Sequence, residues 1–399
     1  MNTKDTFTAE EKRLIKAKVP EVRQLLLDNL AKFTHHPLPL LKCGDIYNGL
    51  WLEHNQDNFF LADYAPENAW AAMDALINFQ REDGLIPFHF GLGEPDDPKT
   101  TSFGQVQCVW AFTRCALEIA KKTHRPPEDL QRLYDAGVRY DQWFAKYRNH
   151  AGTGLAEMFC EYDTGHDNDP RVTDDGIPRA CPGKDAINMP DLPIMPVLSV
   201  DLSAMLYGNR IALAELATML GKTAYAGYWA TRASELASAI DKYLYDPIDN
   251  FYYDRDTRGF RKYRTEHITR LFLNHVLPQA RFDSIYEQHF LQQGKGFCAP
   301  YPIPSVAIDD PHFDKTCPKN SWGCNTQALT TERAILWMTH YGRKDDLVEL
   351  LSRWMRAFIK YDSKFPQEIN PFTGAPIGDS GNYCPALIIF LEAAKVIFG

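Results

Sequence analysis

The chain has 399 residues, of which 45% are hydrophobic and 24% charged, a composition typical of a globular protein with one large domain or two modest ones. The net charge of −9 and the lack of basic stripes argue against a phosphate-rich partner such as a nucleic acid. The first residues lack a basic stretch followed by an apolar run, and no later stretch approaches eighteen apolar residues. We therefore expect neither an export signal nor a membrane partner.

Nine cysteines are scattered along the chain, without CxxC pairs or Cys/His pairs at zinc spacing. An odd number of scattered cysteines does not suit a complete set of disulfides. We therefore expect reduced thiols in a cytoplasmic protein and no structural zinc.

Apolar residues recur at helical spacing from the first element to the last. Residues 8–11, TAEE, resemble a capping box, and the apolar run that follows keeps helical spacing to about residue 33. Pro66 opens the next helix, which ends at residue 79 before a Gly/Pro turn. Further predicted helices cover residues 104–122, 127–146, 199–220, 222–244, 264–276, 280–293, 326–341, 344–359 and 385–398, with part of another at 58–64. Residues 251–254 and 259–261 predict a small β-hairpin among them.

The connections between these helices are of two kinds. Some are tight turns, as at Gly221 and Gly342, and others are long, rich in Gly and Pro, and full of aromatic and acidic residues. This alternation predicts an all-α fold of helical hairpins that form a toroid, the (α/α)6 barrel, with the long loops at one mouth. A solenoid would show a repeat of fixed length, and these spacings are irregular. No shift in composition divides the chain, so we expect a single domain over residues 1–399.

The segment 161–171 is the first candidate for an active site. It holds four carboxylates, and Gly165 and Pro170 prevent a helix from running through it, so it should be an ordered loop. The same composition also suits a solvated acidic turn or a weak calcium loop.

Other long loops bring further polar and aromatic residues to the same mouth. They are Asp57 with Asn55 and Trp51, Gln105, Trp322 and the segment 364–374. Carboxylates that are far apart in sequence but meet at one mouth suit glycoside hydrolysis, in which one acid protonates the leaving oxygen and one base activates water. Aromatic faces suit the C–H patches of a sugar ring. Some of these residues also have purely structural explanations, because Asp57 can cap the helix that begins near residue 59 and Trp322 can be a core residue.

Four motifs carry a resemblance to a known family. Residues 163–171, DTGHDNDPR, resemble the acidic-small-Gly-x-Asp-Asn-x-Pro-Arg signature of family 63 glycoside hydrolases, the mannosylglycerate hydrolase and oligosaccharide glucosidase group. Residues 56–60, QDNFF, resemble that family's Trp-Asp-x-Phe-Phe motif. Residues 80–87, QREDGLIP, and 370–374, NPFTG, resemble two of its turns. The motifs occur in the family's order over most of the chain, whereas trehalases are more distant.

The resemblance implies roles for individual residues. Asp167 corresponds to the general acid, Asp57 to the aspartate that holds sugar hydroxyls, and Gln105 to a residue near the sugar. The family's base is a glutamate four residues before the proline of the last motif, and here that position is Gln367. An amide cannot take a proton from water, so we predict that a one-residue shift presents Glu368 as the base.

A second departure lies at residues 320–325, where the family has a Trp-Arg-Gly motif. The arginine of that motif is missing here, and Trp322 is predicted to form a wall of the pocket. The resulting prediction is an inverting exo-glycosidase that acts on a short α-glucoside or α-mannoside, a small carbohydrate, without a metal or organic cofactor. Asp167 and Glu368 are its predicted catalytic residues. The predicted substrate-binding residues are Asp57, Trp51, Asn55, Gln105, Asn168, Arg171, Trp322 and Gln367.

Two alternatives remain open from the sequence. A sugar epimerase of the N-acylglucosamine 2-epimerase type also uses an (α/α)6 toroid, but it needs paired histidines at the mouth, chosen here from His54, His89, His166, His267 and His275. A non-catalytic sugar-binding toroid would explain both Gln367 and the missing arginine. Proton exchange at C2 of a free sugar distinguishes an epimerase from a glycosidase.

Overall fold

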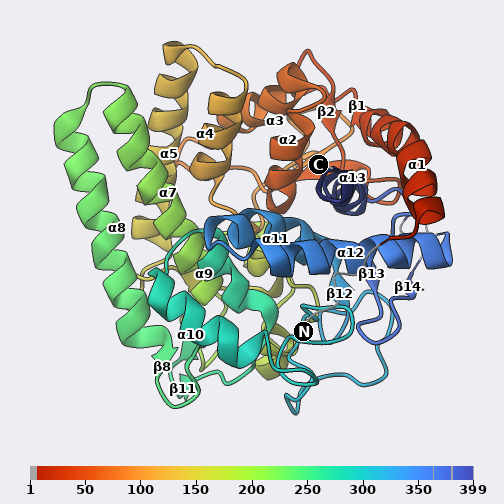
Figure 1. The fold of residues 1–399 in the computed structure, drawn as a ribbon. Helices are drawn as coiled ribbons and strands as arrows, with labels where there is room; N and C mark the ends of the chain where they lie inside the picture. Colours follow the sequence, from red (N-terminus) through yellow and green to blue (C-terminus); the bar gives the residue numbers. More distant parts are fainter. Residues whose placement is uncertain (1–6, 363, 379–380, 399) are drawn as a thin grey trace.

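The computed structural model describes residues 7–362, 364–378 and 381–398, and helices make up about half of the chain (Figure 1). The α-helices of these residues are α1 (Ala9–Asp28), α2 (Asn55–Leu61), α3 (Pro66–Asn78), α4 (Phe112–Lys122), α5 (Pro127–Tyr147), α6 (Pro170–Thr173), α7 (Val200–Met219), α8 (Thr223–Leu244), α9 (Thr269–Leu273), α10 (Gln279–His289), α11 (Ala328–His340), α12 (Lys344–Tyr361) and α13 (Cys384–Phe398).

The strands are two or three residues long and form small antiparallel sheets in the loops. They are β1 (Leu30–Ala31) with β2 (Leu40–Leu41); β3 (Gly49–Trp51), β4 (His89–Gly91) and β5 (Thr101–Ser102); β6 (Glu157–Met158), β7 (Val197–Leu198), β10 (Arg255–Asp256) and β11 (Gly259–Phe260); β8 (Tyr245–Asp246) with β9 (Phe251–Tyr252); and β12 (Thr326–Gln327), β13 (Glu368–Ile369) and β14 (Pro376–Ile377). In the last sheet Gln327 pairs with Glu368, and Glu368 pairs with Ile377.

Six helices contact one another in a closed cycle: α2 with α4, α4 with α7, α7 with α9, α9 with α11, α11 with α13, and α13 with α2. A second helix packs on each member, namely α3 on α2, α5 on α4, α8 on α7, α12 on α11 and α1 on α13. The ring centroids of Phe272 on α9 and Phe282 on α10 lie 4.8 Å apart and join the remaining pair. Figure 1 shows α8 and α1 at opposite edges of the molecule, with α13 directly beside α1.

Burial distinguishes the two sets of helices. On α13, residues 384–391 are all buried, so this helix is surrounded by protein. On α8 the buried residues follow a single stripe at helical spacing, Trp229, Ala233, Leu236, Ile240 and Leu244. Buried apolar side chains from both sets belong to one large cluster that extends from α1 to α13.

Several predicted boundaries were wrong. The helix expected from residue 104 begins only at Phe112, since Gln107 has a positive φ of 44° that a helix cannot contain. The helix expected over 264–276 is reduced to a 3-10 turn (Glu266–Ile268) followed by α9. The hairpin forms between β10 and β11, whereas β9 pairs with β8. No helix in the described part of the chain has the length and apolar character needed to cross a membrane.

Candidate active site

A cavity of about 220 Å³ opens where the long loops meet. Its walls combine five aromatic residues with two carboxylates and several amides. The lining residues are Tyr47, Trp51, Glu53, His54, Gln105, Gln107, Tyr162, Gly165, Asp167, Trp322, Gln367 and Tyr383. Most of them lie in segments that precede helices of the inner cycle, α2, α4, α7, α11 and α13. Because the volume is below the roughly 300–1,000 Å³ of pockets for drug-sized ligands, the cavity suits one small polar ring.

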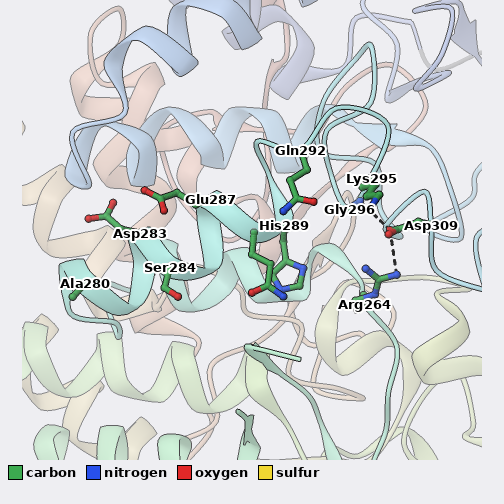
Figure 2. A pocket seen from close by; sticks show the side chains of 11 residues that line it. Arg264, Ala280, Asp283, Ser284, Glu287, His289, Gln292, Lys295, Gly296 and Asp309 are labelled. Atoms are coloured by element: carbon green, nitrogen blue, oxygen red, sulfur yellow. Dashed lines mark hydrogen bonds and ion pairs between the residues drawn. The ribbon is translucent and has the colours of Figure 1, made fainter. Parts of the chain in front are cut away.

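A larger hollow of about 790 Å³ lies beside α10 (Figure 2). Two of its carboxylates are paired with cations: Asp309 with Arg264 at 3.1 Å, and Asp283 with Arg343 at 2.8 Å. Asp309 also accepts a hydrogen bond from the backbone N–H of Gly296 at 2.9 Å. This hollow is open and polar, so the smaller cavity, with one buried and one half-buried carboxylate and aromatic walls, is the better candidate.

Asp163 anchors the loop 161–171 to the protein interior through hydrogen bonds. This fully buried carboxylate accepts hydrogen bonds from the guanidinium of Arg148 at 2.5 Å and from the backbone N–H groups of Val106 and Phe159 at 2.8 Å each. The chain then turns at Gly165, whose φ is 71°, and a Cβ there would collide with Oε2 of Glu53. Glycine at this position therefore allows the loop to approach the cavity floor.

Asp167 lines the cavity and is half-buried. Burial, and after it the negative charges of Glu53 and Glu161, raise the pKa of its carboxyl to about 7, against a smaller opposing effect of Arg179. Below that pH the group is mostly protonated, and it faces aromatic and amide groups. This is the state that a general acid needs near neutral pH.

Asn168 does not line the cavity but braces its wall. Its side-chain Nδ2 donates to the carbonyl of Asn320 at 2.6 Å, and its Oδ1 accepts from the backbone N–H of Trp322 at 2.9 Å. The indole of Trp322, which does line the cavity, lies 4.7 Å from the ring of His166. In this structure Asn168 positions Trp322 and does not reach the cavity, where the sequence predicted it to contact the substrate.

Arg171 lies in a buried ionic cluster beneath the loop. Its guanidinium donates to Asp254 at 2.6 Å and to Asp201 at 2.7 Å, and it contacts Nδ1 of His166 at 2.6 Å. All these groups are buried, and Arg171 does not line the cavity. Its predicted contact with a substrate does not fit this geometry, because its charge is already satisfied by two carboxylates.

The predicted base and its neighbour face different ways. Gln367 lines the cavity, and its Oε1 accepts a hydrogen bond from the hydroxyl of Tyr47 at 2.8 Å. Glu368 does not line it: its carboxylate accepts from the backbone N–H groups of Asn320 and Ser321, the latter at 3.2 Å. Successive side chains of a strand point to opposite faces, so a one-residue shift in β13 removes the carboxylate from the wall.

A third donor, Nε2 of Gln327, lies 2.8 Å from Oε2 of Glu368. Burial raises the pKa of Glu368, whereas the hydrogen bonds from these donors lower it. Hydrogen bonds from Asn320 and Ser321, which directly precede Trp322, thus hold the carboxylate of Glu368 away from the cavity.

Asp57 and Asn55 lie on α2, below the cavity. Asn55 donates to the carbonyl of Trp110 at 2.8 Å, and Asp57 accepts from Gln56 at 3.0 Å and contacts His54 at 3.0 Å. Both predicted sugar ligands are buried and neither lines the cavity, since the first turn of α2 points them into the protein. Burial raises the pKa of Asp57 to about 8. Neither side chain reaches the cavity surface in this structure.

Trp51 and Gln105 lie in the cavity wall, where the sequence analysis expected them. Gln105 donates from Nε2 to Oε1 of Gln107 at 2.6 Å. Trp51 packs edge-on against Tyr47, with ring centroids 5.8 Å apart. The two residues thus belong to continuous polar and aromatic parts of the wall.

Seven of the twelve lining residues were not among the predicted catalytic and substrate-binding residues. The most informative of them is Glu53, which is 9% exposed and whose Oε2 has no hydrogen-bond partner among the described residues. A buried acceptor without a partner on a cavity wall calls for a donor from a ligand. The signal available in the sequence was an acid that directly follows the apolar residues 50–52 and begins the polar run 53–58. The other missed lining residues are Tyr47, His54, Gln107, Tyr162, Gly165 and Tyr383.

One group of possible metal ligands occurs among the described residues, Cys160 with Asp163 and Cys181. The guanidinium of Arg148 already donates to Asp163 at 2.5 Å and lies 3.6 Å from the sulfur of Cys181. A fixed positive charge among these ligands disfavours a metal cation there. All nine cysteines are free thiols.

Comparisons with known proteins point to one family. The sequence profile of the mannosylglycerate hydrolase MGH1-like glycoside hydrolase domain matches residues 60–384. Mannosylglycerate hydrolase MGH1 of Selaginella moellendorffii is 32% identical over a stretch that spans 30% of this chain and 28% of that protein, and MGH2 of the same plant is 31% identical over a stretch of the same extent.

Among solved structures, the GH63 mannosylglycerate hydrolase from Thermus thermophilus in complex with glucose has the same fold, with a TM-score of 0.71 at 18% identity, covering 94% of this chain and 99% of that one. Neutral trehalase Nth1 from Saccharomyces cerevisiae has a TM-score of 0.67 at 13% identity, covering 95% of this chain and 80% of that one. Since the family profile covers most of its length, the chain belongs to the mannosylglycerate hydrolase MGH1-like glycoside hydrolase family.

Proposed function

We propose that this protein is a glycoside hydrolase that releases the terminal sugar of a short α-glucoside or α-mannoside with inversion at the anomeric carbon. The observation that carries the proposal is Asp167, a half-buried carboxyl with a pKa raised to about 7 on the wall of a small aromatic cavity. Family membership supports the reaction class, and the relatives named as mannosylglycerate hydrolases support a small glycosylated solute as substrate.

The proposal includes the architecture. We assign the chain to a single domain with the (α/α)6 barrel fold. The closed cycle of α2, α4, α7, α9, α11 and α13, with a partner helix on each, supports this assignment. One continuous apolar cluster from α1 to α13 supports the single domain.

In the proposed reaction Asp167 gives its proton to the glycosidic oxygen as the bond from that oxygen to C1 breaks. A water molecule forms the new bond to C1 from the opposite face, and its proton passes to a base. Positive charge develops on the sugar ring in the transition state, and the nearby carboxylate of Glu53 would stabilise it electrostatically.

Glu368 remains our proposed base. It is the carboxylate at the start of β13, directly after the lining residue Gln367. To take a proton from water in the cavity it has to leave the backbone donors of Asn320 and Ser321, which requires movement of the segment 320–322. The proposal therefore requires the segment 320–322 to move before the glycosidic bond can be cleaved.

The cavity lining favours an uncharged sugar. No Lys or Arg is among the lining residues, so an anionic ring would meet Glu53 and Asp167 without a compensating charge. Hydroxyl groups can donate to Glu53 and exchange hydrogen bonds with Gln105 and Gln107, while the aromatic walls cover the C–H faces. The free thiols of all nine cysteines agree with the cytoplasmic location that we propose.

One observation favours a second candidate, a sugar-binding protein without turnover. Gln367 lines the cavity at the position where the family's glutamate base is expected, and an amide cannot serve as that base. The epimerase alternative has less support, because His54 alone among the histidines lines the cavity and such an enzyme needs a pair.

Hydrolysis of 4-nitrophenyl α-glucoside and α-mannoside, mannosylglycerate, glucosylglycerate and α-linked disaccharides tests the proposal. We expect Asp167→Asn and Glu368→Gln each to reduce kcat/KM by roughly 10²- to 10⁴-fold on the best substrate. Gln367→Glu tests the alternative position of the base. If this substitution raises the rate, and the rate stays high when Glu368→Gln is added, the base is at position 367 and not at 368. Sugar binding by the wild type without hydrolysis of any substrate would establish the second candidate.

A further inference from the structure

Glu53 reaches the cavity wall from a short 3-10 turn, Leu52–His54, that directly precedes α2. Its side chain is mostly buried, and Oε2 has no hydrogen-bond partner among the residues that the structure describes. On one side the carboxylate borders Gly165, where a Cβ would collide with Oε2. No side chain holds this oxygen, so its place on the wall depends on the backbone of the turn.

Arg333 on α11 holds that backbone. Its Nη2 donates a hydrogen bond to the carbonyl of Glu53 at 2.7 Å, although the two residues are 280 positions apart in the sequence. Next to it on α11, Glu332 accepts from Nε2 of Gln56 at 3.0 Å. Helix α13 lies between α2 and α11 in the closed cycle, so these two links join elements that are not neighbours in it. The turn that carries Glu53 is thus tied to a distant helix.

The charge of Arg333 has little value for the fold itself. The residue is 2% exposed, and its Nε has no partner in the described part of the chain. The guanidiniums of Arg148 and Arg171 are equally buried, but each donates to a carboxylate. Burying a cation whose N–H groups are incompletely paired is destabilising, and an apolar side chain of similar size would avoid this cost. The hydrogen bond to Glu53 gives the buried guanidinium a reason to be there.

We infer that Arg333 is a positioning residue that holds Glu53 in place as an acceptor for a hydroxyl group of the bound sugar. The inference rests on the proposed function only in taking the cavity as a sugar site. Arg333 itself does not line the cavity, so its effect on a ligand has to pass through Glu53. A carboxylate accepts hydrogen bonds and donates none, so the ligand has to present hydroxyl hydrogens at this part of the wall.

A double-mutant cycle tests whether Arg333 acts through Glu53. The probes are D-glucose and D-mannose, and calorimetric titration measures their Kd. We expect Glu53→Ala to weaken binding of the tighter of the two sugars about tenfold or more, as the loss of a hydrogen bond to a charged group does. Arg333→Met should weaken it about fivefold in the protein with Glu53, but less than about twofold in the Glu53→Ala protein, where no carboxylate is left to position.

Arg210 provides a matched control. It is 3% exposed, its Nη1 donates to the backbone carbonyl of Arg232 at 3.2 Å, and it does not line the cavity. Arg210→Met should lower the midpoint of urea unfolding and leave the Kd of both sugars unchanged, because its effect is only structural.

A crystal structure of Arg333→Met gives a direct readout of position. We expect the turn of Glu53 to be displaced and its carboxylate to leave the cavity wall. If Arg333→Met does not fold, Arg333→Lys replaces it in the cycle. Lysine keeps a buried cation but lacks the planar fork of the guanidinium, so the same loss of affinity is expected, again confined to proteins that carry Glu53.

The outcomes distinguish the inference from the proposed function. Unchanged affinity in Glu53→Ala, equal weakening by Arg333→Met with and without Glu53, or an unmoved Glu53 in the crystal structure would overturn the inference even if glycosides are hydrolysed. The expected coupling without hydrolysis of any glycoside would uphold the inference and refute the hydrolase. If glycosides are hydrolysed but neither sugar binds measurably, KM of the best glycoside should follow the same pattern. Neither binding nor hydrolysis would refute both.

Discussion

At the residue scale, the surroundings of Asp167 set the pKa of its carboxyl group. Its pKa is raised to about 7 by burial and then by the charges of Glu53 and Glu161. A general acid must be protonated, so kcat/KM should fall as the pH rises through about 7, with one proton lost. Glu53→Gln removes a negative charge that disfavours ionisation, so it should lower the pKa of Asp167 and move this decline to lower pH. The pH profile of kcat/KM measures the shift, and a decline at unchanged pH would contradict the electrostatic coupling.

Gly165 gives a second prediction at this scale. Its φ of 71° is unfavourable for other residues, and a Cβ would collide with Glu53. Gly176 has the same φ of 71°, and a Cβ added there would meet nothing within 4 Å, so it is a matched control. We expect Gly176→Ala to cost about 1 kcal/mol of unfolding free energy and to leave activity unchanged. Gly165→Ala should cost more and also reduce turnover, as urea unfolding and initial rates would show. Equal effects of the two substitutions would contradict a close approach of this loop to Glu53.

The residues found from the sequence and those missed differ in a physical way. Asp167 and Trp322 belong to segments where carboxylates, glycines and aromatics cluster, and such composition indicates a loop with a function. Tyr383 lies next to a helix that the sequence shows only as an apolar run, and Glu53 lies just before the QDNFF motif; only the fold brings the two residues to the cavity. Glu368 was predicted as the base from the family's motif and a one-residue shift of a loop, but Glu368 begins strand β13, and Gln367 is the residue of the two that lines the cavity.

At the element scale, the loop 161–171 depends on one buried ion pair. Arg148 at the end of α5 donates to Asp163 and to the carbonyl of Glu157, and both partners of the pair are fully buried. We expect Asp163→Asn to lower the unfolding free energy by about 3–5 kcal/mol, because it leaves a buried guanidinium without its counter-charge.

The exposed pair of Glu10 and Arg13 on α1 provides the control, since its separation of 2.7 Å is similar. Glu10→Gln should leave the unfolding free energy almost unchanged, because solvent screens the pair. Urea denaturation of both variants measures the contrast. A cost for Asp163→Asn as small as that of the control would show that the loop has another anchor.

Helix existence was predictable and helix ends were less so. The amphipathic stripe of α8 and the continuous apolar run of α13 appear in the sequence, and both helices lie where periodicity placed them. Residues 104–111 have the apolar spacing of a helix but are not helical. They form an irregular segment in which Gln105 and Gln107 line the cavity. The contacts that decide this come from residues far away in sequence, which a local pattern does not contain.

At the scale of the whole molecule, the closed cycle of helices makes the first and last helices neighbours. α1 packs on α13, and one apolar cluster includes residues from both. If the chain is one domain, far-UV circular dichroism and tryptophan fluorescence should report a single unfolding transition with the same midpoint in urea. Two transitions with separate midpoints would contradict the single domain that we propose.

The central claim is that the cavity with Asp167 on its wall is where a glycosidic bond is broken with inversion. ¹H NMR of the first sugar released from the best α-glucoside or α-mannoside tests it most directly, with wild type and Asp167→Asn compared side by side. The account predicts that the β-anomer appears first with the wild type, before mutarotation, and that Asp167→Asn releases sugar at least about a hundredfold more slowly. Initial release of the α-anomer, or an unchanged rate in Asp167→Asn, would contradict it.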